Sequence, residues 1–173
     1  YTENSLWERV RQHPEQRLTA SAVLYSCHRK EVWMVGDCQC LIGGRAFTNG
    51  KQIDALLAEV RSVYLEARLL QGISQEALLE HDTGRDCIRP FLVEQSVFQN
   101  LPSSASPYAY AVFDGFPLPP SALRILPVAP GEQVVLASDG YPRLFPTLAA
   151  SERYLHELLQ KDPLCLRSYK STK

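Results

Sequence analysis

The sequence predicts an α+β fold in which antiparallel sheets are covered by helices. Its β-prone segments are joined by connections of hairpin length, which antiparallel strands allow and parallel strands do not. Residues 51–70 instead repeat apolar side chains at helical spacing. Strands and helices also occur in blocks, whereas a doubly wound parallel sheet requires them to alternate.

The first half of the chain is predicted to contain one helix followed by two hairpins. The helix lies within residues 1–13, where Leu6, Trp7 and Val10 recur at helical spacing, and Pro14 is expected to end it. Apolar and β-prone runs then predict four strands. These strands cover residues 18–26, 31–36, 39–42 and 45–47, with polar or glycine turns between the members of each pair.

The second half is predicted to contain a helical region, three strands and a final helix. Ser74 is suited to cap the start of a short helix, and Pro90 is expected near the start of the next one. Residues 101–107 form a Pro/Ser linker, and Pro130-Gly131 makes a turn between the last two strands. The predicted helices are 51–70, 75–79, 85–98 and 148–161, and the predicted strands are 108–113, 123–128 and 133–137.

Length, charge and cysteine content narrow the functional class. The 173 residues suit a single domain, 1–173, with a helical insertion at about 51–100. The net charge of −1 gives no electrostatic reason to expect nucleic acid or anionic lipid as a partner. No apolar run approaches the ~20 residues of a membrane helix. Five scattered cysteines and no signal peptide suggest a reducing, cytoplasmic location, and both ends of the domain are expected to be incomplete.

Two apolar runs each end in a carboxylate, which makes Asp37 and Asp139 candidate metal ligands. Residues 32–35 lead into Gly36-Asp37, and residues 134–137 lead into Ser138-Asp139-Gly140. An aspartate at the end of a buried strand is partly desolvated and favours a cation. Two such strand ends on one sheet edge would offer the oxygen ligands that Mg²⁺ or Mn²⁺ prefers. The alternative is that both are ordinary turns, where Asp and Gly are common.

In their order along the chain, these elements resemble the metal-dependent type-2C serine/threonine protein phosphatases. The resemblance covers residues 17–162, and its most specific part is the string Leu-Ala-Ser-Asp139-Gly140 after the turn at 129–132. It implies a two-layer β-sandwich flanked by helices, with a binuclear Mg²⁺ or Mn²⁺ centre. It also implies that metal-bound water attacks a phosphoserine or phosphothreonine of a phosphoprotein substrate.

The resemblance also assigns roles to individual residues. Asp139 matches a core metal ligand, and Asp37 matches the acidic position near an additional, weaker metal site. The backbone groups of Gly140 would position the site and would not coordinate the metal. Residues 1–16 hold no counterpart of the family's Asp-Gly element that bridges the two metals, and Cys38 stands where serine is common. A catalytically inactive, phosphatase-like regulatory or binding module is therefore the alternative to an enzyme.

Three weaker signals favour structural roles. Cys27, His28, Cys38 and Cys40 could be assembled into a zinc site, but the usual spacing within a cysteine pair is missing, which favours free thiols. Ser138 lacks the Gly-x-Ser-x-Gly surroundings of a nucleophile. Asp114-Gly115 precedes a proline-rich segment and is expected to be a turn.

Overall fold

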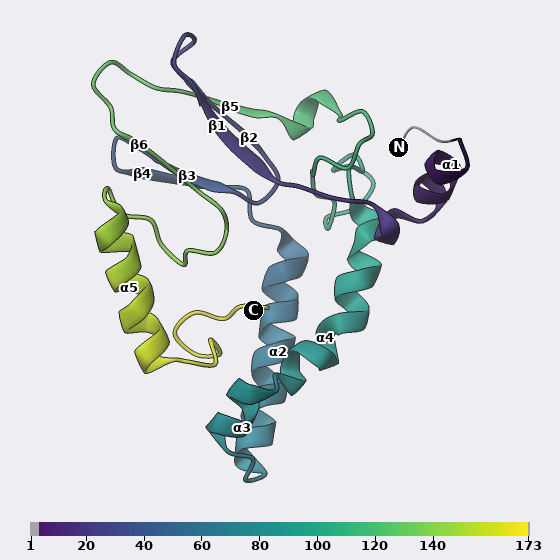
Figure 1. Ribbon diagram of the computed structural model, residues 1–173, viewed down its shortest axis with the longest axis vertical. Coiled ribbons are helices and arrows are strands. Elements are labelled where there is room, and N and C mark those ends of the chain that lie inside the picture. Colours follow the sequence, from purple (N-terminus) through teal and green to yellow (C-terminus); the bar gives the residue numbers. More distant parts are fainter. Residues whose placement is uncertain (1–3, 173) are drawn as a thin grey trace.

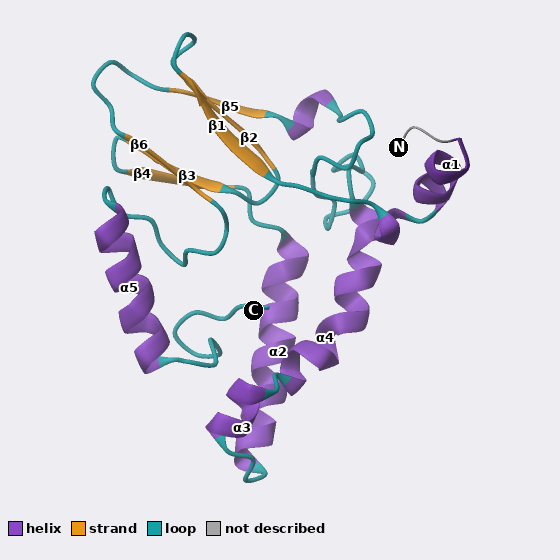
Figure 2. Ribbon diagram, viewed as in Figure 1, coloured by secondary structure: helices purple, strands orange, loops and turns teal. Residues whose placement is uncertain are grey.

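The computed structural model describes residues 4–172 and confirms the α+β class (Figures 1 and 2). Six strands form two antiparallel three-stranded sheets, ordered β1-β2-β5 and β4-β3-β6. The strands are β1 (Ala22–Ser26), β2 (Glu31–Val35), β3 (Gln39–Ile42), β4 (Arg45–Thr48), β5 (Arg124–Pro127) and β6 (Val134–Ala137). The helices are α1 (Asn4–Gln12), α2 (Gln52–Leu70), α3 (Gln75–Glu80), α4 (Thr83–Glu94) and α5 (Leu148–Lys161).

The two sheets contribute to one hydrophobic core. Val32 and Met34 of β2 pack with Cys40 and Ile42 of β3 and with Val128, and all five are buried. Successive side chains of a strand point to opposite faces, so this core takes alternate residues of each strand. The core fixes how the end of β2 leads into β3, which is the segment that contains Asp37.

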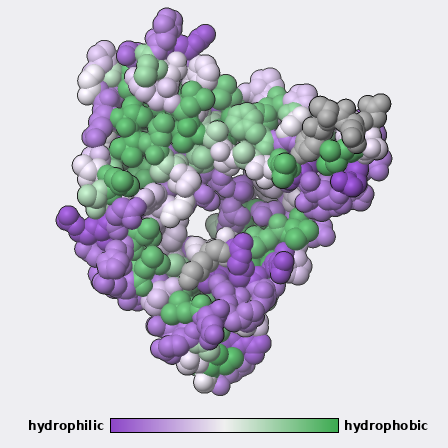
Figure 3. Space-filling view, in the orientation of Figure 1, coloured by the Kyte–Doolittle hydropathy of each residue, from purple (hydrophilic) through white to green (hydrophobic). Residues whose placement is uncertain are grey.

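The other face of the first sheet is apolar but exposed. Leu24, Trp33 and Ile125 are register partners across β1, β2 and β5. Leu24 and Ile125 keep about half of their surface exposed, at 46% and 50%. Figure 3 shows hydrophobic residues gathered over this part of the molecule. Within residues 4–172, the expected cover of helices is therefore missing from this face.

Helices α2, α3 and α4 form an arm that extends from the sheets (Figure 1). Leu65 of α2 and Leu78 of α3 are buried together with Leu164 and Leu166 of the segment after α5. The side chain of Ser74 accepts a hydrogen bond from the Ala77 N–H, which confirms the expected cap. The chain therefore returns after α5 to pack against its own helical arm.

Arg61 anchors this return. Its side chain is fully buried, at 0% exposure. The guanidinium donates to the Asp82 carboxylate at 2.6 and 3.0 Å, and to the carbonyl oxygens of Leu164 and Ser171 at 2.9 and 3.1 Å. A buried charge is tolerated only with such a complete set of partners.

The prediction of a strand at 108–113 is wrong. The segment makes only isolated bridges, between Ala20 and Phe113 and between Gln99 and Tyr110. The Asn100 side chain donates to the Val112 carbonyl and accepts from the Val112 N–H, both at 3.0 Å. An amide side chain thus takes the place of a neighbouring strand.

The turn at 130–131 lies between β5 and β6 as predicted, and these two strands belong to different sheets. Two other expectations need correction. Pro90 lies inside α4 rather than near its start. Helix α4 ends at Glu94, and a short 3₁₀ helix, Gln95–Phe98, follows it.

The remaining helix predictions are confirmed where the structure describes them. Helix α5 has the predicted bounds, and α1 ends before Pro14 as expected, although residues 1–3 of its predicted range lie outside the described residues. Within residues 4–172, none of the helices combines the length and the apolar character that a membrane-spanning segment requires.

Candidate functional site

The pairing of β3 with β6 brings the two candidate carboxylates to the same end of one sheet. Gln39 is opposite Ala137, and each further step along β3 moves one residue back along β6. The ladder ends at this pair, and Asp37 and Asp139 each lie two residues beyond it, at the same end of the sheet. Both carboxylates also act on the same neighbours, since each raises the pKa of the Cys38 thiol and of the Asp54 carboxyl in addition to the larger effect of burial.

Asp37 lies on the connection between the two sheets and has two polar partners. The Ser21 hydroxyl donates to Asp37 Oδ1 at 2.5 Å, and Lys51 Nζ lies 2.6 Å from Oδ2. The side chains of Asp37 and Lys51 are only 13% and 15% exposed. Burial opposes ionisation of Asp37, but the bonds from Lys51 and Ser21 outweigh it and lower the pKa of the carboxyl.

Lys51 sits at the centre of this cluster, immediately before α2. Its Nζ lies 3.8 Å from Asp54 Oδ2 and 4.9 Å from the centre of the Tyr110 ring. Burial raises the pKa of Asp54, and it raises the pKa of the Tyr110 hydroxyl with a further contribution from the Asp54 charge. The ammonium therefore holds together two carboxylates and an aromatic face from distant parts of the chain.

Sequence reasoning did not find Ser21, Lys51 or Asp54. Ser21 lies immediately before β1, within the predicted strand 18–26, and Asp54 lies in the first turn of α2. An acidic residue in the first turn of a helix is common, so Asp54 did not stand out in the sequence as a functional residue. Lys51 resembles a solvated lysine in the sequence, and only the tertiary fold pairs it with Asp37.

Asp139 has a different environment, because its side chain is exposed. Its loop is held by Gln39, whose Nε2 donates to the carbonyl oxygens of Ser138 and Tyr141 at 2.9 and 2.7 Å. The Gly140 N–H donates to the Ser138 hydroxyl oxygen at 3.4 Å. Within residues 4–172, Asp139 has no ion-pair partner, so its carboxylate is accessible to a ligand.

A cation-binding role can be tested against the donor set. No group of three or more His, Cys, Asp or Glu side chains among residues 4–172 is arranged to hold a metal, which also applies to the cysteines considered for zinc. The described residues therefore do not supply the binuclear centre that the resemblance implies. Mg²⁺ commonly binds through one or two carboxylates and keeps several waters. Asp37 and Asp139 fit that chemistry for one hydrated cation, provided that Lys51 leaves Asp37.

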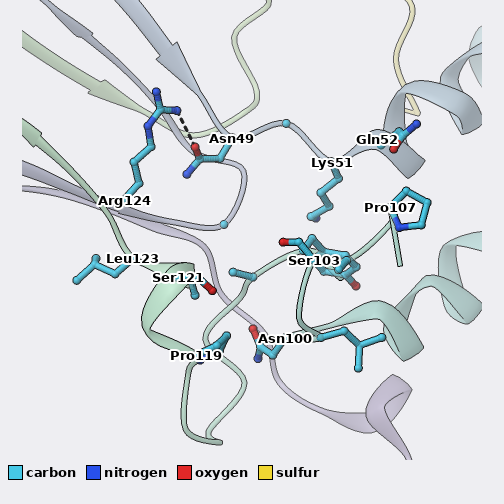
Figure 4. A pocket seen from close by; sticks show the side chains of 17 residues that line it. Asn49, Lys51, Gln52, Asn100, Ser103, Pro107, Pro119, Ser121, Leu123 and Arg124 are labelled. Carbon is cyan, nitrogen blue, oxygen red and sulfur yellow. Dashed lines mark hydrogen bonds between the residues drawn. The ribbon is translucent and has the colours of Figure 1, made fainter. Parts of the chain in front are cut away.

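A cavity of about 560 Å³ adjoins this cluster. Lys51 and Tyr110 belong to both, and Gly36, the neighbour of Asp37, also lines the cavity. Figure 4 shows Arg124 and Lys51 on different sides of this cavity, with Asn100, Ser103 and Ser121 also along its wall. Among residues 4–172, its lining contains these two cationic side chains and no aspartate or glutamate. A second cavity of about 490 Å³ lies on the exposed apolar face and is lined by Leu24, Trp33 and neighbouring apolar residues.

Comparison with known proteins finds no match among family models, curated proteins or solved structures. The resemblance to type-2C phosphatases therefore rests on the residues quoted above. The function has to be argued from the site itself.

Proposed function

We propose that this chain carries the core of a type-2C-like serine/threonine protein phosphatase, whose two sheets form the layers of a β-sandwich. The proposed activity is hydrolysis of phosphoserine and phosphothreonine monoesters of protein substrates with Mg²⁺ or Mn²⁺. The observation that carries the proposal is the pairing of β3 with β6, because Asp37 and Asp139 both lie two residues beyond the same end of that ladder. A reducing, cytoplasmic location belongs to the same proposal and is supported by five free cysteines.

In this proposal Asp37 and Asp139 hold the cation, and Gly140 and Gln39 keep the Asp139 loop in position. The bound cation would supply Lewis-acid stabilisation of the phosphoryl group and a water of lowered pKa. Ser21 keeps one oxygen of Asp37 oriented by its hydrogen bond. Burial raises the pKa of this carboxyl and the Ser21 bond lowers it, so that bond still favours the ionised form once Lys51 has left.

The test is Mn²⁺-dependent hydrolysis of a phosphothreonine peptide by the intact protein. Asp139→Asn preserves the size of the side chain and removes its charge, and we expect it to lower kcat/KM about 100-fold or more. Asp86→Asn is the matched control, because Asp86 is an exposed aspartate of α4 that pairs with His81 at 2.9 Å. Unchanged turnover by Asp139→Asn would refute the assignment.

A second candidate is a non-catalytic, phosphatase-like regulatory or binding module. The observation that favours it is the Lys51 ammonium, which already neutralises Asp37 at 2.6 Å. This candidate predicts no heat of Mn²⁺ binding by calorimetry in the intact protein. The phosphatase proposal predicts Mn²⁺ binding that Asp139→Asn weakens and Asp86→Asn leaves unchanged.

A further inference from the structure

The 560 Å³ cavity lies beside the cluster formed by Asp37, Lys51 and Asp54, which we call the acidic cluster. The cluster is acidic, whereas the cavity is positively charged. None of its lining residues is acidic, and their polar side chains are amides and hydroxyls together with Lys51 and Arg124. The charge of Lys51 is largely balanced by Asp37, at 2.6 Å. While Lys51 is paired with Asp37, Arg124 is therefore the cation that gives the cavity its net positive charge.

Arg124 is held in place by neutral groups. Its Nη1 donates to the Thr48 carbonyl oxygen and to Asn49 Oδ1, both at 2.9 Å. Its Cζ lies 5.5 Å from the centre of the Phe47 ring. It has no carboxylate partner within the described part of the chain. The guanidinium is thus oriented without being neutralised, and an arginine in this state favours carboxylate and phosphate ligands.

The size of the cavity suits a short peptide segment. Its volume of about 560 Å³ lies within the range of about 300–1,000 Å³ that is usual for ligand sites. Ser103 and Ser121 are exposed residues of its wall and can bond the backbone of an extended peptide. Because the cavity shares Lys51 with the acidic cluster, a peptide bound at the cluster can continue into it.

We propose that this cavity binds an acidic segment of the substrate next to the phosphorylated residue, with Arg124 as the residue that determines the preference. This inference rests on the proposed function for the identity of the ligand. It predicts selection of phosphosites flanked by aspartate or glutamate.

The experiment compares two fluorescent phosphothreonine peptides that differ only in their flanks, three aspartates against three asparagines. Binding is measured by fluorescence anisotropy in EDTA, and kcat/KM is measured with Mn²⁺. We expect the aspartate peptide to bind about tenfold tighter, with a preference that weakens as salt is added. Arg124→Gln should abolish the preference, and Arg124→Lys should retain part of it. Arg153→Gln makes the same change of charge at an exposed arginine of α5 outside the cavity and should retain all of it.

Ser121→Asp adds a carboxylate to the cavity without removing the arginine, and we expect it to abolish the preference in a chain that keeps its Arg124 contacts. Equal binding of the two peptides by the unaltered protein, or a preference that survives both Arg124→Gln and Ser121→Asp, would overturn the inference. Hydrolysis of both peptides at equal kcat/KM would overturn it while leaving the phosphatase proposal intact. A binding preference without hydrolysis would support the cavity and contradict the phosphatase proposal.

Discussion

Gly36 connects backbone geometry with the candidate site, and its replacement by alanine tests that connection. Gly36 follows β2 with φ +82°, a conformation that L side chains rarely adopt. A Cβ there would lie 2.6 Å from the Ser21 Cβ and 3.0 Å from the Ser21 Cα. Gly44 also has φ +82°, but nothing lies within 4 Å of its added Cβ. The two glycines therefore share the strain and differ only in the collision.

The geometry gives different magnitudes for the two substitutions. The left-handed conformation costs about 1–2 kcal/mol for an L residue, and the reduced entropy of the unfolded chain offsets about 0.4–1 kcal/mol. We therefore expect Gly44→Ala to lower the free energy of unfolding by about 1 kcal/mol. Gly36→Ala adds an overpacking cost of about 1–3 kcal/mol, giving a total of about 2–4 kcal/mol.

Urea unfolding followed by tryptophan fluorescence measures both variants. A second readout is the pKa of the Asp37 carboxyl, which should rise in Gly36→Ala because the displaced Ser21 hydroxyl no longer donates to it. Adding Ser21→Gly to Gly36→Ala removes most of the collision and should recover part of the lost stability. Equal losses of stability in Gly36→Ala and Gly44→Ala would refute the reasoning.

Three further predictions concern buried charges. In urea unfolding, Arg61→Met should lower the free energy of unfolding by about 3–5 kcal/mol, because the buried partners of Arg61 lose their donor. Arg89→Met, at an exposed arginine of the same helical arm, should change it by less than about 0.5 kcal/mol. Burial raises the pKa of the Asp162 carboxyl, but hydrogen bonds from backbone N–H groups after α5 outweigh burial and lower that pKa. The ionised carboxylate therefore stabilises the fold above the unfolded pKa of about 3.9, and this stabilisation is lost as the pH falls. Asp162→Asn should therefore cost about 2 kcal/mol in urea unfolding at pH 7 and less at pH 3, and equal costs would contradict this. Asp114→Asn breaks a 3.0 Å pair with Arg17 in which the carboxylate is fully buried, so a drop of about 3 kcal/mol is expected by thermal unfolding, and a drop below about 1 kcal/mol would contradict it.

Local patterns in the sequence predicted most of the secondary structure. The switch from β-prone runs to helical spacing placed α2 within one residue of its observed bounds, and residues 148–161 form α5 as predicted. These patterns succeed because burial of one face imposes a period on the sequence. They failed at 108–113, where the decisive partner of the Val112 backbone is the distant side chain of Asn100.

The candidate site was predictable only in part. Each strand end showed a carboxylate, but the placement of Asp37 and Asp139 at one end of a sheet depends on the pairing of β3 with β6, which lie far apart in the chain. The pairing of Asp37 with Lys51 is likewise a product of the tertiary fold. A sequence pattern shows which residue ends a strand, and it does not show that Lys51 pairs with Asp37 in the folded protein.

The Gln39 amide gives the two carboxylates different sensitivities to their surroundings. Gln39 restrains the Asp139 loop through two hydrogen bonds from a group that carries no charge. Asp37 is instead restrained by the Lys51 ammonium together with the Ser21 hydroxyl, so its position depends on the charge of another side chain. A change that withdraws the Lys51 charge from Asp37 would therefore loosen one half of the pair and leave the other anchored, so that the two halves need not move together.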